Sequence, residues 1–408
     1  MNKLSYLEKL LDGVEVEWKT LEKVLKRTKG TKITAGQMKA LHKDNAPLKI
    51  FAGGKTVAFV DFKDIPEKDI NREPSIIVKS RGIIEFEYYD KPFSHKNEMW
   101  SYHSDNDAIS IKYIYYFLKI NEGYFQKIGG KMQMPQIATP DTDKFEVPIP
   151  CPDNPEKSLA IQAEIVRILD KFTALTAELT AELTARKKQY NYYRDQLLSF
   201  EEGAAPFYPL GQKEVGEFIR GGSFQKKDFT KSGIGCIHYG QIFTHYGTYA
   251  NKTKTFVSES LAQKCRKAKT GNLVIATTSE NDDDVCKAVA WLGTEDIAVS
   301  SDACIYRHNL NPKYVSYFFQ TESFQSQKRQ YITGTKVRRV NADNLAKILI
   351  PVPSQEEQTR IVDILDKFDL LTSSISQGLP REIELRQKQY EYYRDLLFSF
   401  PKPDSVTN

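Results

Sequence analysis

The 408-residue chain carries one long pattern twice. Residues 164–172 read Glu-Ile-Val-Arg-Ile-Leu-Asp-Lys-Phe and return at 360–368 as Arg-Ile-Val-Asp-Ile-Leu-Asp-Lys-Phe, while residues 186–200 return at 386–400 around Gln-Tyr-x-Tyr-Tyr-Arg-Asp. A solenoid repeats every 20 to 50 residues or so, whereas this repeat is spaced by about half the chain. The pattern therefore predicts two copies of one unit in one polypeptide, a pseudo-dimer suited to a two-part target.

Length and composition predict a globular protein of two to three domains. The chain is 40% hydrophobic and 27% charged, and no run of about 18 apolar residues exists that could span a membrane. The first residues lack a signal-peptide core. We therefore expect no membrane partner and a cytoplasmic location.

Cysteines and net charge are less informative. Five cysteines form no C-x-x-C pair, and we expect reduced, mostly buried thiols. The net charge of +5 is small for this length and does not itself demand nucleic acid.

A long helix is predicted in the first copy of the repeat. Its apolar positions step by three or four residues, at Ile161, Ile165, Ile168, Leu169, Phe172, Leu175, Leu179 and Leu183. No Gly or Pro interrupts residues 158–200, and about 40 helical residues would extend about 60 Å. Such a helix needs a partner, which we expect to be the second copy lying antiparallel to it.

The two copies differ in three ways. Ser354 with Glu357 resembles a capping box at the start of the second copy. The second copy is longer between its two motifs and contains Gly378-Leu-Pro380, which should break or kink the helix. The first copy contains a tandem Thr-Ala-Glu-Leu unit at 176–183, and one such unit is close to a helical turn. Its alternative interpretation is a chance run of helix formers.

The regions 13–153 and 204–352 predict mixed α/β domains, because short β-branched and aromatic runs alternate with Gly-Gly breaks. They are faintly related to each other. Lys-Tyr-Ile-Tyr-Tyr-Phe-Leu at 112–118 resembles Lys-Tyr-Val-Ser-Tyr-Phe-Phe at 313–319, and each region closes on Pro-x-Pro. Residues 6–11 resemble the repeat ends at 193–198 and 393–398, so the arrangement is predicted to be cyclic.

Two variable α/β domains alternating with repeated helices, the Pro-x-Pro segments, Ile-Leu-Asp-Lys-Phe and Gln-Tyr-x-Tyr-Tyr-Arg-Asp together resemble the specificity subunit of type I restriction-modification enzymes. The Thr-Ala-Glu-Leu tandem is similar to the spacer repeat of the type IC group. The resemblance covers essentially the whole chain. It implies two target-recognition domains that each read half of a split DNA site, and helices that set their separation and hold two modification (methyltransferase) subunits. Restriction subunits would join through the modification subunits.

The resemblance and the patterns together predict an α/β (mixed α+β) protein. Two globular target-recognition domains are expected to be separated by two long antiparallel helices that form a coiled coil, in a pseudo-two-fold, cyclic arrangement. The expected segments are a helix fragment at 1–12, target-recognition domains at 13–153 and 204–352, and helical spacers at 154–203 and 353–408.

Motifs for catalysis are absent from the sequence. It has no Asn/Asp-Pro-Pro-Tyr/Phe methylation loop, no G-x-x-x-x-G-K-[ST] phosphate loop and no nuclease-type acid-x-Lys arrangement. The acidic run Glu280–Asp284 and the pair His238 and His245 are weak metal candidates, favoured less than a solvated loop and ordinary histidines. We expect a non-catalytic chain that binds no cofactor, with S-adenosylmethionine, ATP and Mg²⁺ on the partner subunits.

Basic and polar stretches open each α/β region and precede each Pro-x-Pro exit. Their side chains can neutralise phosphates or pair with base edges, whereas the alternative is a solvated basic loop. The predicted DNA-binding residues are Lys26, Arg27, Lys29, Lys131, Gln133, Gln136, Arg220, Ser223, Gln225, Lys226, Lys227, Tyr239, Gln241, Thr278, Lys336, Arg338 and Arg339.

Aromatic residues crowd the helix ends. They indicate either packing between the helices or a docking surface for partner subunits, and the sequence favours neither alternative. The predicted partner-binding residues are Tyr190, Tyr193, Arg194, Tyr390, Tyr393 and Arg394.

The functional prediction is a subunit that recognises a split, asymmetric duplex DNA site and positions methyltransferase and restriction subunits on it. The rival hypothesis is a coiled-coil adaptor with two protein-binding domains. A stand-alone methyltransferase or nuclease is disfavoured because its motifs are missing.

Overall fold

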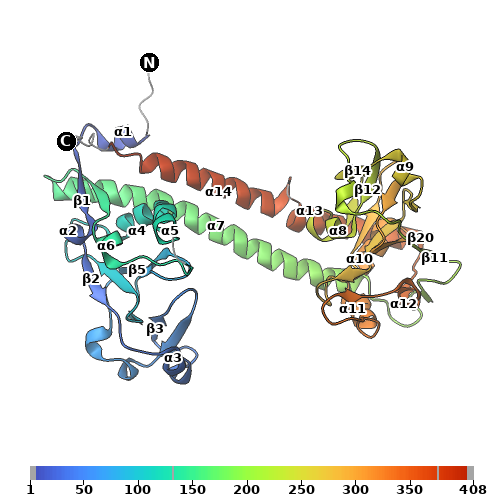
Figure 1. The fold of residues 1–408 in the computed structure, drawn as a ribbon, viewed down its shortest axis with the longest axis horizontal. Helices are drawn as coiled ribbons and strands as arrows, with labels where there is room; N and C mark the ends of the chain where they lie inside the picture. The colour runs from blue at the N-terminus through green and yellow to red at the C-terminus, as the bar shows by residue number, and fades with distance from the viewer. Residues whose placement is uncertain (1–5, 131–132, 375, 402–408) are drawn as a thin grey trace, which may run out of the picture. The chain divides into compact units, whose positions relative to one another are not determined.

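The protein divides into two compact units (Figure 1). The computed structural model describes residues 6–130, 133–374 and 376–401. Unit 1 comprises Met1–Ala177 with Leu385–Asn408, and unit 2 comprises Glu178–Glu384. Among the described residues, no helix is both long and apolar enough to cross a membrane.

The described residues of unit 1 form nine strands and several short helices, in addition to the parts of the long helices that belong to this unit. The strands are β1 Val16–Thr20, β2 Lys26–Lys29, β3 Leu48–Phe51, β4 Val57–Val60, β5 Ser75–Lys79, β6 Glu85–Tyr89, β7 Phe93–His95, β8 Trp100–His103 and β9 Glu146–Pro150. The helices are α1 Tyr6–Leu11, α2 Leu21–Val24, α3 Ala35–Leu41, α4 Ile111–Ile120, α5 Glu122–Gly129 and α6 Thr139–Asp143, with 3-10 turns η1 Phe62–Asp64 and η2 Glu67–Asp69.

Unit 2 is built from a similar series. Its strands are β10 Phe207–Pro209, β11 Gly216–Arg220, β12 Ile234–Ile237, β13 Tyr249–Ala250, β14 Thr255–Val257, β15 Lys267–Ala268, β16 Leu273–Ala276, β17 Thr278–Ser279, β18 Ala288–Trp291, β19 Ile297–Val299, β20 Ala303–His308, β21 Arg338–Arg339 and β22 Leu349–Pro351. Its helices are α8 Tyr239–Thr244, α9 Glu259–Ala262, α10 Pro312–Phe318, α11 Glu322–Arg329, α12 Ala342–Leu345 and α13 Gln355–Ser373, with the 3-10 turn η3 Lys226–Asp228.

The two units share one sheet topology. The order β2-β8-β5-β6 in unit 1 corresponds to β11-β20-β16-β18 in unit 2, where β13 adds a fifth strand. The order β4-β3-β7 corresponds to β14-β12-β19, and in both triplets one neighbour of the central strand is antiparallel and the other parallel. The antiparallel pairs β1-β9 and β10-β22 close the two domains next to the Pro-x-Pro segments. The predicted relation between the two α/β regions is therefore confirmed.

The long helix α7 runs unbroken from Pro155 to Leu197, as predicted (green in Figure 1). Its apolar stripe is buried in unit 1 at Ile161, Ile165 and Leu169 and half-buried at Leu175, Leu179 and Leu183. In unit 1 its first half packs against the end of α14 (Gly378–Leu397), where Phe172 stacks on Tyr393 at 5.4 Å, and Figure 1 shows the two helices running in opposite directions.

The equivalent ring pair is formed in unit 2, where Tyr193 of α7 stacks on Phe368 of α13 at 5.7 Å. Tyr190 contacts the same Phe368 ring at 6.4 Å. Phe172 repeats as Phe368, and Tyr193 repeats as Tyr393. In unit 1 the first copy therefore supplies the phenylalanine and the second copy the tyrosine, whereas in unit 2 the first copy supplies the tyrosine and the second copy the phenylalanine. The predicted packing of the two repeated helices against each other is thus observed inside each unit.

The second copy is interrupted where the sequence indicated. Helix α13 ends at Ser373 and α14 begins at Gly378, which has a φ of +77°. A Cβ at Gly378 would lie 2.4 Å from the carbonyl oxygen of Leu370, so glycine is required there. Pro380 falls in the first turn, where its missing N–H costs no helical hydrogen bond.

The capping box predicted at Ser354 is half formed. The Ser354 hydroxyl accepts a hydrogen bond from the backbone N–H of Glu357 at 3.2 Å. The Glu357 carboxylate pairs with Arg360 at 2.6 Å instead of returning to the cap.

Each domain is joined to its helix by the same set of bonds, which we call the joint. In unit 1, the Asp170 carboxylate accepts from the Lys112 ammonium at 2.7 Å and from the Tyr116 hydroxyl at 2.5 Å. The Tyr113 hydroxyl donates to the carbonyl oxygen of Pro148 at 2.8 Å, and the Gln162 amide oxygen accepts from the backbone of Ser110 at 2.9 Å.

The joint of unit 2 repeats this pattern bond for bond. The Asp366 carboxylate accepts from Lys313 at 2.6 Å and from the Tyr317 hydroxyl at 2.7 Å. Tyr314 donates to the Pro351 carbonyl at 2.9 Å, and Gln358 accepts from the backbone of Asn311 at 2.8 Å. Burial and the adjacent carboxylate raise the pKa of Tyr317, so its hydroxyl keeps the proton that it donates.

The amino-terminal helix α1 and the end of the chain's described part pack in one core of unit 1. Leu7 and Leu11 share a hydrophobic cluster with Leu397, Phe398 and Phe400. The Trp18 indole donates to the carbonyl oxygen of Pro401 at 3.0 Å. Residues 6–11 are thus helical, and their equivalence to the ends of the repeated helices stays a prediction.

Candidate nucleic-acid interface

In each domain, two segments that are distant in the sequence pair over one or two residues at an equivalent place, and we call them the crossing segments. In unit 2, β17 pairs with β21 so that Thr278 faces Arg339, and the Val340 N–H donates to the Thr277 carbonyl at 3.1 Å. In unit 1, an isolated bridge joins Arg81 to Gln136, and the Ile137 N–H donates to the Ser80 carbonyl at 3.0 Å. Gln136 and Arg339, from two predicted exit patches, therefore occupy equivalent positions.

Three predicted residues of unit 2 meet at one cavity of about 300 Å³. Arg220 ends β11, Thr278 begins β17 and Arg339 ends β21, and all three line the cavity together with Asp302. Arg220 and Arg339 are exposed, whereas Thr278 is 6% exposed. Sequence positions separated by up to 119 residues thus form one cationic, hydrogen-bonding concavity.

The Gly221-Gly222 pair serves packing inside the protein. A Cβ at Gly221 would lie 2.1 Å from the carbonyl oxygen of Ser300, and a Cβ at Gly222 would lie 2.7 Å from Cys265. The two glycines therefore let the chain pass close to its own backbone and to Cys265. The buried Phe224 then anchors the following loop.

That loop presents four predicted residues to solvent. Ser223, Gln225, Lys226 and Lys227 are all exposed, and the Gln225 backbone is fixed by the Asp228 carboxylate at 2.8 Å. The amide and the two ammonium groups are therefore available for phosphate or base contacts.

A tight turn at residues 333–339, which we call the reading hairpin, precedes the Pro-x-Pro exit of unit 2. Thr333 and Arg339 exchange two backbone hydrogen bonds of 2.9 Å each. Lys336 and Val337 are exposed at the tip. Arg338 is partly buried, and its Nε lies 2.9 Å from an Asp282 carboxylate oxygen.

Gln241 and Tyr239 sit further inside than the sequence suggested. Gln241 is 7% exposed, and its amide bonds the His238 backbone at 3.0 Å and the Thr255 hydroxyl at 2.9 Å. Tyr239 is half-buried, with its backbone N–H bonded to the Ser300 hydroxyl at 2.9 Å. These bonds give Gln241 a structural task, and its contact with DNA stays a prediction.

In unit 1, Lys29 occupies the position that Arg220 has in unit 2. Lys29 pairs with Trp100 at the end of β2 as Arg220 pairs with Cys304 at the end of β11. Lys26 pairs with Asp105, and Arg27 lies 3.2 Å from Asp143. Of the three predicted cations, Lys29 is thus the one whose position matches the cationic strand end of unit 2.

The exit patch of unit 1 is polar. Gln133 and Gln136 are exposed, and the Gln136 amide oxygen accepts from Arg81 at 3.0 Å. Arg81 was missed by the sequence reasoning, and no motif marks it. The exposed Met134 lies beside these residues, while the predicted Lys131 lies outside the described residues.

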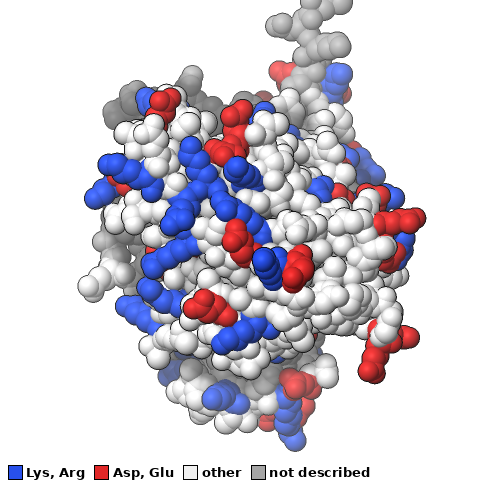
Figure 2. All heavy atoms as spheres, turned by 90° about the vertical axis from the view of Figure 1, so that its right-hand side faces the viewer, with Lys and Arg blue, Asp and Glu red and all other residues white. Residues whose placement is uncertain are grey.

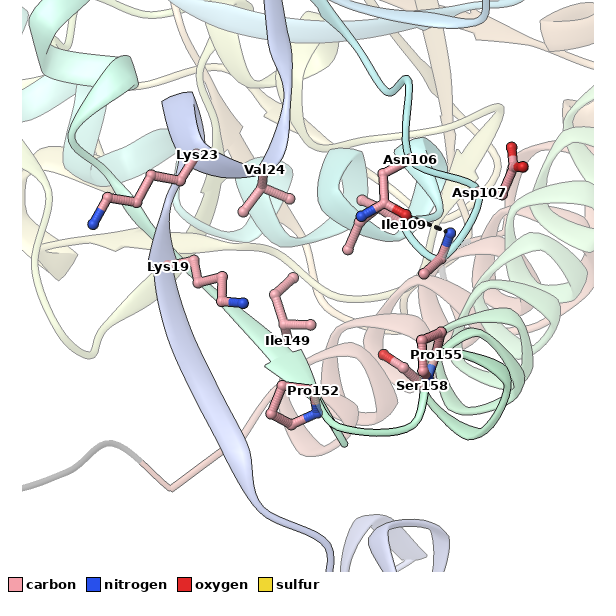
Figure 3. Close-up of a pocket in the computed structure, with 11 residues that line it drawn as sticks. Lys19, Lys23, Val24, Asn106, Asp107, Ile109, Ile149, Pro152, Pro155 and Ser158 are labelled. Carbon is pink, nitrogen blue, oxygen red and sulfur yellow. Dashed lines mark hydrogen bonds between the residues drawn. The ribbon is translucent and has the colours of Figure 1, made fainter.

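The basic stretch that opens unit 1 is divided by the fold. Lys19 and Lys23 line a separate cavity of about 370 Å³ beside the start of α7, with Pro152, Pro155 and Ser158 (Figure 3). In Figure 3, Lys19 extends toward Ile149, whereas Lys23 points away from the other labelled residues. Lys19 also pairs with Glu17 at 2.8 Å, so the stretch is not one continuous patch.

Charge is unevenly distributed over the surface. Figure 2 shows Lys and Arg side chains gathered on part of one face, where acidic side chains are few. Such a field attracts polyanions and speeds their association at low salt.

Comparison with known proteins settles the family. The sequence model of the type I restriction modification DNA specificity domain matches residues 15–186 and 210–385, once for each half of the chain. The chain belongs to this family.

Two specificity subunits from Escherichia coli match over all or most of their length. The specificity subunit of the Escherichia coli type I restriction enzyme EcoR124I/EcoR124II is 40% identical over 415 residues and covers 100% of both chains. That of the E. coli enzyme EcoprrI is 31% identical, covering 92% of this chain and 93% of the relative. The solved type I S subunit of Mycoplasma genitalium superposes with a TM-score of 0.57 at 14% identity, covering 96% of this chain and 98% of that one, which shows a shared fold.

In this type I specificity protein, the aromatic helix ends divide between packing and exposure. Tyr190 and Arg194 are 7% and 9% exposed, and the Arg194 guanidinium lies over the Tyr190 ring at 5.5 Å. Tyr390 and Arg394 form the equivalent pair at 5.8 Å, and both are partly buried. For these four residues, contacts within the units account for the burial and the pairing of the side chains.

The neighbouring tyrosines face outward. Tyr193 and Tyr393 are 40% and 41% exposed while stacked on phenylalanine, and Tyr192 and Tyr392 are 61% and 64% exposed. Tyr192 and Tyr392 belong to the aromatic helix ends for which the sequence left packing and partner docking open. Their similar exposure in the two units is the property that the sequence alone did not show.

The weak metal candidates have other partners. In the acidic run, the Asp282 carboxylate lies 2.9 Å from Nε of Arg338, and the Asp284 carboxylate accepts from the Asn281 amide at 2.8 Å. His238 caps α8 by accepting from the Gly240 N–H at 3.2 Å. Within the described part of the chain, no three His, Cys, Asp or Glu side chains gather as a metal site would need.

Proposed function

We propose that the chain reads a split duplex DNA site, with each unit contacting one half-site. One observation carries this proposal. In both units a strand ends in a basic residue beside the crossing segments, and the side chains of these segments differ between the two units. Unit 2 has Arg220 beside Thr278 and Arg339, and unit 1 has Lys29, Arg81 and Gln136 at the equivalent positions. Arginine can pair with guanine and glutamine with adenine, so the two units are suited to different sequences.

The same proposal includes the partners. The family match supports assembly of the chain with two modification subunits, and with restriction subunits through them. The exposed Tyr192 and Tyr392 supply equivalent aromatic positions on the helix ends, which suits a pair of identical partners.

The chemistry is assigned to those partners. The chain itself is proposed to be non-catalytic, with S-adenosylmethionine, ATP and Mg²⁺ bound by the modification and restriction subunits. Its contribution would be to select the site and to place the methyltransferases there.

The test is to purify the chain with its modification subunits and to sequence the methylated positions in cells that contain the complex. A split motif with a fixed gap is expected. Binding to a duplex with that motif should resist competitor DNA and weaken with salt. The adaptor hypothesis predicts no motif that depends on this chain, and salt-sensitive binding without sequence preference would favour it.

A further inference from the structure

A buried ammonium group lies behind the reading hairpin of unit 2. Lys328 of α11 is 0% exposed. Its Nζ donates hydrogen bonds to the carbonyl oxygens of Asp282 at 2.8 Å, Asp283 at 3.1 Å and Val285 at 2.9 Å. A buried charge is costly unless it is fully bonded, and three acceptors match the three donors of an ammonium. Lys328 therefore fixes the backbone of the acidic loop at 280–285.

The side chains of this loop are arranged around that backbone. Asn281 and Asp284 bond each other, with 2.8 Å between side-chain nitrogen and oxygen and 2.8 Å from the Asp284 N–H to the Asn281 oxygen. Asp282 is directed to the hairpin, where its carboxylate meets Nε of Arg338 at 2.9 Å. The acidic run thus contains one carboxylate that connects the loop to the reading hairpin.

Arg338 links the loop to the start of the hairpin. Besides Asp282, its guanidinium donates to the carbonyl oxygen of Gly334 at 2.5 Å. Gly334 has a φ of +87°, and a Cβ there would lie 2.2 Å from the Val337 carbonyl oxygen, so the turn is tight. Arg338 thus ties the turn of residues 334–337 to a loop that Lys328 holds rigidly.

Arg339 follows in the same strand, where successive side chains point to opposite faces. It lines the cavity with Arg220 and Thr278, and it is exposed. Among the described residues, its guanidinium has no carboxylate within ion-pair distance, whereas Arg338 has Asp282. The two adjacent arginines, which look alike in sequence, therefore differ in what they can still bind.

We propose that Asp282 and Arg338 position the reading hairpin and that Arg339 makes the contact with the half-site read by unit 2. This inference rests on the proposed function. It assigns the acidic loop a positioning role in DNA specificity, with Lys328 as its buried anchor.

The test is a double-mutant cycle in the full chain, purified with its modification subunits. Arg338→Gln, Arg339→Gln and the double variant are compared in binding to a duplex that carries the methylated motif. Arg338→Gln should weaken binding about threefold to fivefold, the scale of one partly exposed ion pair. Because Arg338 acts through Arg339, the double variant should bind no more weakly than Arg339→Gln alone.

The salt dependence of DNA binding and a control aspartate variant distinguish a residue that positions the hairpin from one that contacts DNA. Arg339→Gln should flatten the slope of log K against log salt by about one unit or relax one base of the half-site, whereas Arg338→Gln should leave the slope unchanged. Asp282→Asn should resemble Arg338→Gln. Asp283→Asn removes the same charge from an exposed neighbour with no ion-pair partner in the described chain, and it should bind as wild type.

A charge exchange completes the experiment. Asp282→Arg combined with Arg338→Asp should recover binding relative to either single variant, and thermal unfolding checks that all variants are folded. The inference is overturned if the losses in the double-mutant cycle are additive or if both arginine variants change the salt slope equally. It is also overturned if Asp282→Asn and Asp283→Asn bind alike, or if the exchanged pair binds no better than the single variants. If instead the wild-type complex shows no split motif, the proposed function itself fails.

Discussion

Unit 1 and unit 2 hold their helices in the same way and present different side chains at their crossing segments. The Asp–Lys–Tyr joint has the same donors and acceptors in both, with hydrogen bonds between 2.5 and 2.7 Å. At the crossing segments, Gln136 is bonded to Arg81 in unit 1, whereas Arg339 faces an open cavity in unit 2. The difference teaches that the residues that join a domain to its helix are shared by the two units, whereas the side chains at the crossing segments are not, and this leads to the prediction that DNA specificity can change without a change in the joint.

Exchanging a domain would test this separation most strongly. Replacing residues 13–153 by the corresponding domain of another family member should change one half-site and leave the other intact, because the joint residues on α7 remain. The measurement is the methylated motif in cells. A change in both half-sites by a folded protein would show that the two units read DNA jointly.

The next largest effect is expected from the tandem Thr-Ala-Glu-Leu segment in α7. Inserting one more unit after Leu183 adds about 6 Å of helix and a net turn of about 40°. One base pair adds about 3.4 Å and about 35° of twist, so the rotation matches one base pair. The variant should keep both half-sites and prefer a gap longer by one base pair, and deleting residues 180–183 should shorten it. Unchanged spacing in a folded, assembled variant would contradict the idea of a ruler.

The joint can be broken in one unit at a time. Asp366→Asn should lower the free energy of unfolding by about 2 to 3 kcal/mol, because the Lys313 ammonium loses its carboxylate and Tyr317 loses a charged acceptor. Asp170→Asn should have a similar effect in unit 1. Thermal denaturation is the measurement, and Asp363→Asn, an exposed position on the same helix, is the control. A large effect in one unit and none in the other would show that the joints are not equivalent.

A smaller effect is expected from acid. Burial lowers the pKa of His308 in unit 2 to about 4, below its ordinary value of 6.5. The unfolded chain then binds more protons, so stability is lost as the pH falls from 6.5 toward 4, by about 2 kcal/mol at pH 5.

His308→Gln should therefore unfold with a weaker pH dependence than wild type between pH 7 and pH 5. The exposed His245→Gln serves as the control, with wild-type pH dependence. Burial also lowers the pKa of His95 in unit 1, so part of the acid sensitivity should persist in His308→Gln. An unchanged slope would place the acid sensitivity of unit 2 elsewhere.

The sequence predicted the long helices and their connection to the two domains, because the residues that form them occur twice. The Ile-Leu-Asp-Lys-Phe motif supplies Asp170 and Asp366, and the Lys-Tyr-x-x-Tyr echo supplies their lysine and tyrosine partners. Both motifs were visible as repeats. That they bind each other was not, since spacing along a chain does not say which distant polar groups will meet.

The exposure of the predicted DNA-binding residues could not be read from the sequence, because exposure depends on tertiary packing. Arg338 and Arg339 are chemically identical, yet one is tied to Asp282 and the other is open. Gln241 and Tyr190 look like surface residues by type and are buried. Arg81 escaped notice because it lies in a Gly-containing loop without a motif.

The shared core of α1 and residues 397–400 has a consequence for biosynthesis. Unit 2 is contiguous in the sequence, from Glu178 to Glu384, whereas the core of unit 1 joins Leu7 and Leu11 to Leu397, Phe398 and Phe400. During synthesis, unit 2 can close before the last part of unit 1 has left the ribosome, while unit 1 must keep apolar surface open until then. Chains that end early would carry a complete second domain and an unfinished first one, which marks them for chaperones and proteases before they can occupy partner subunits.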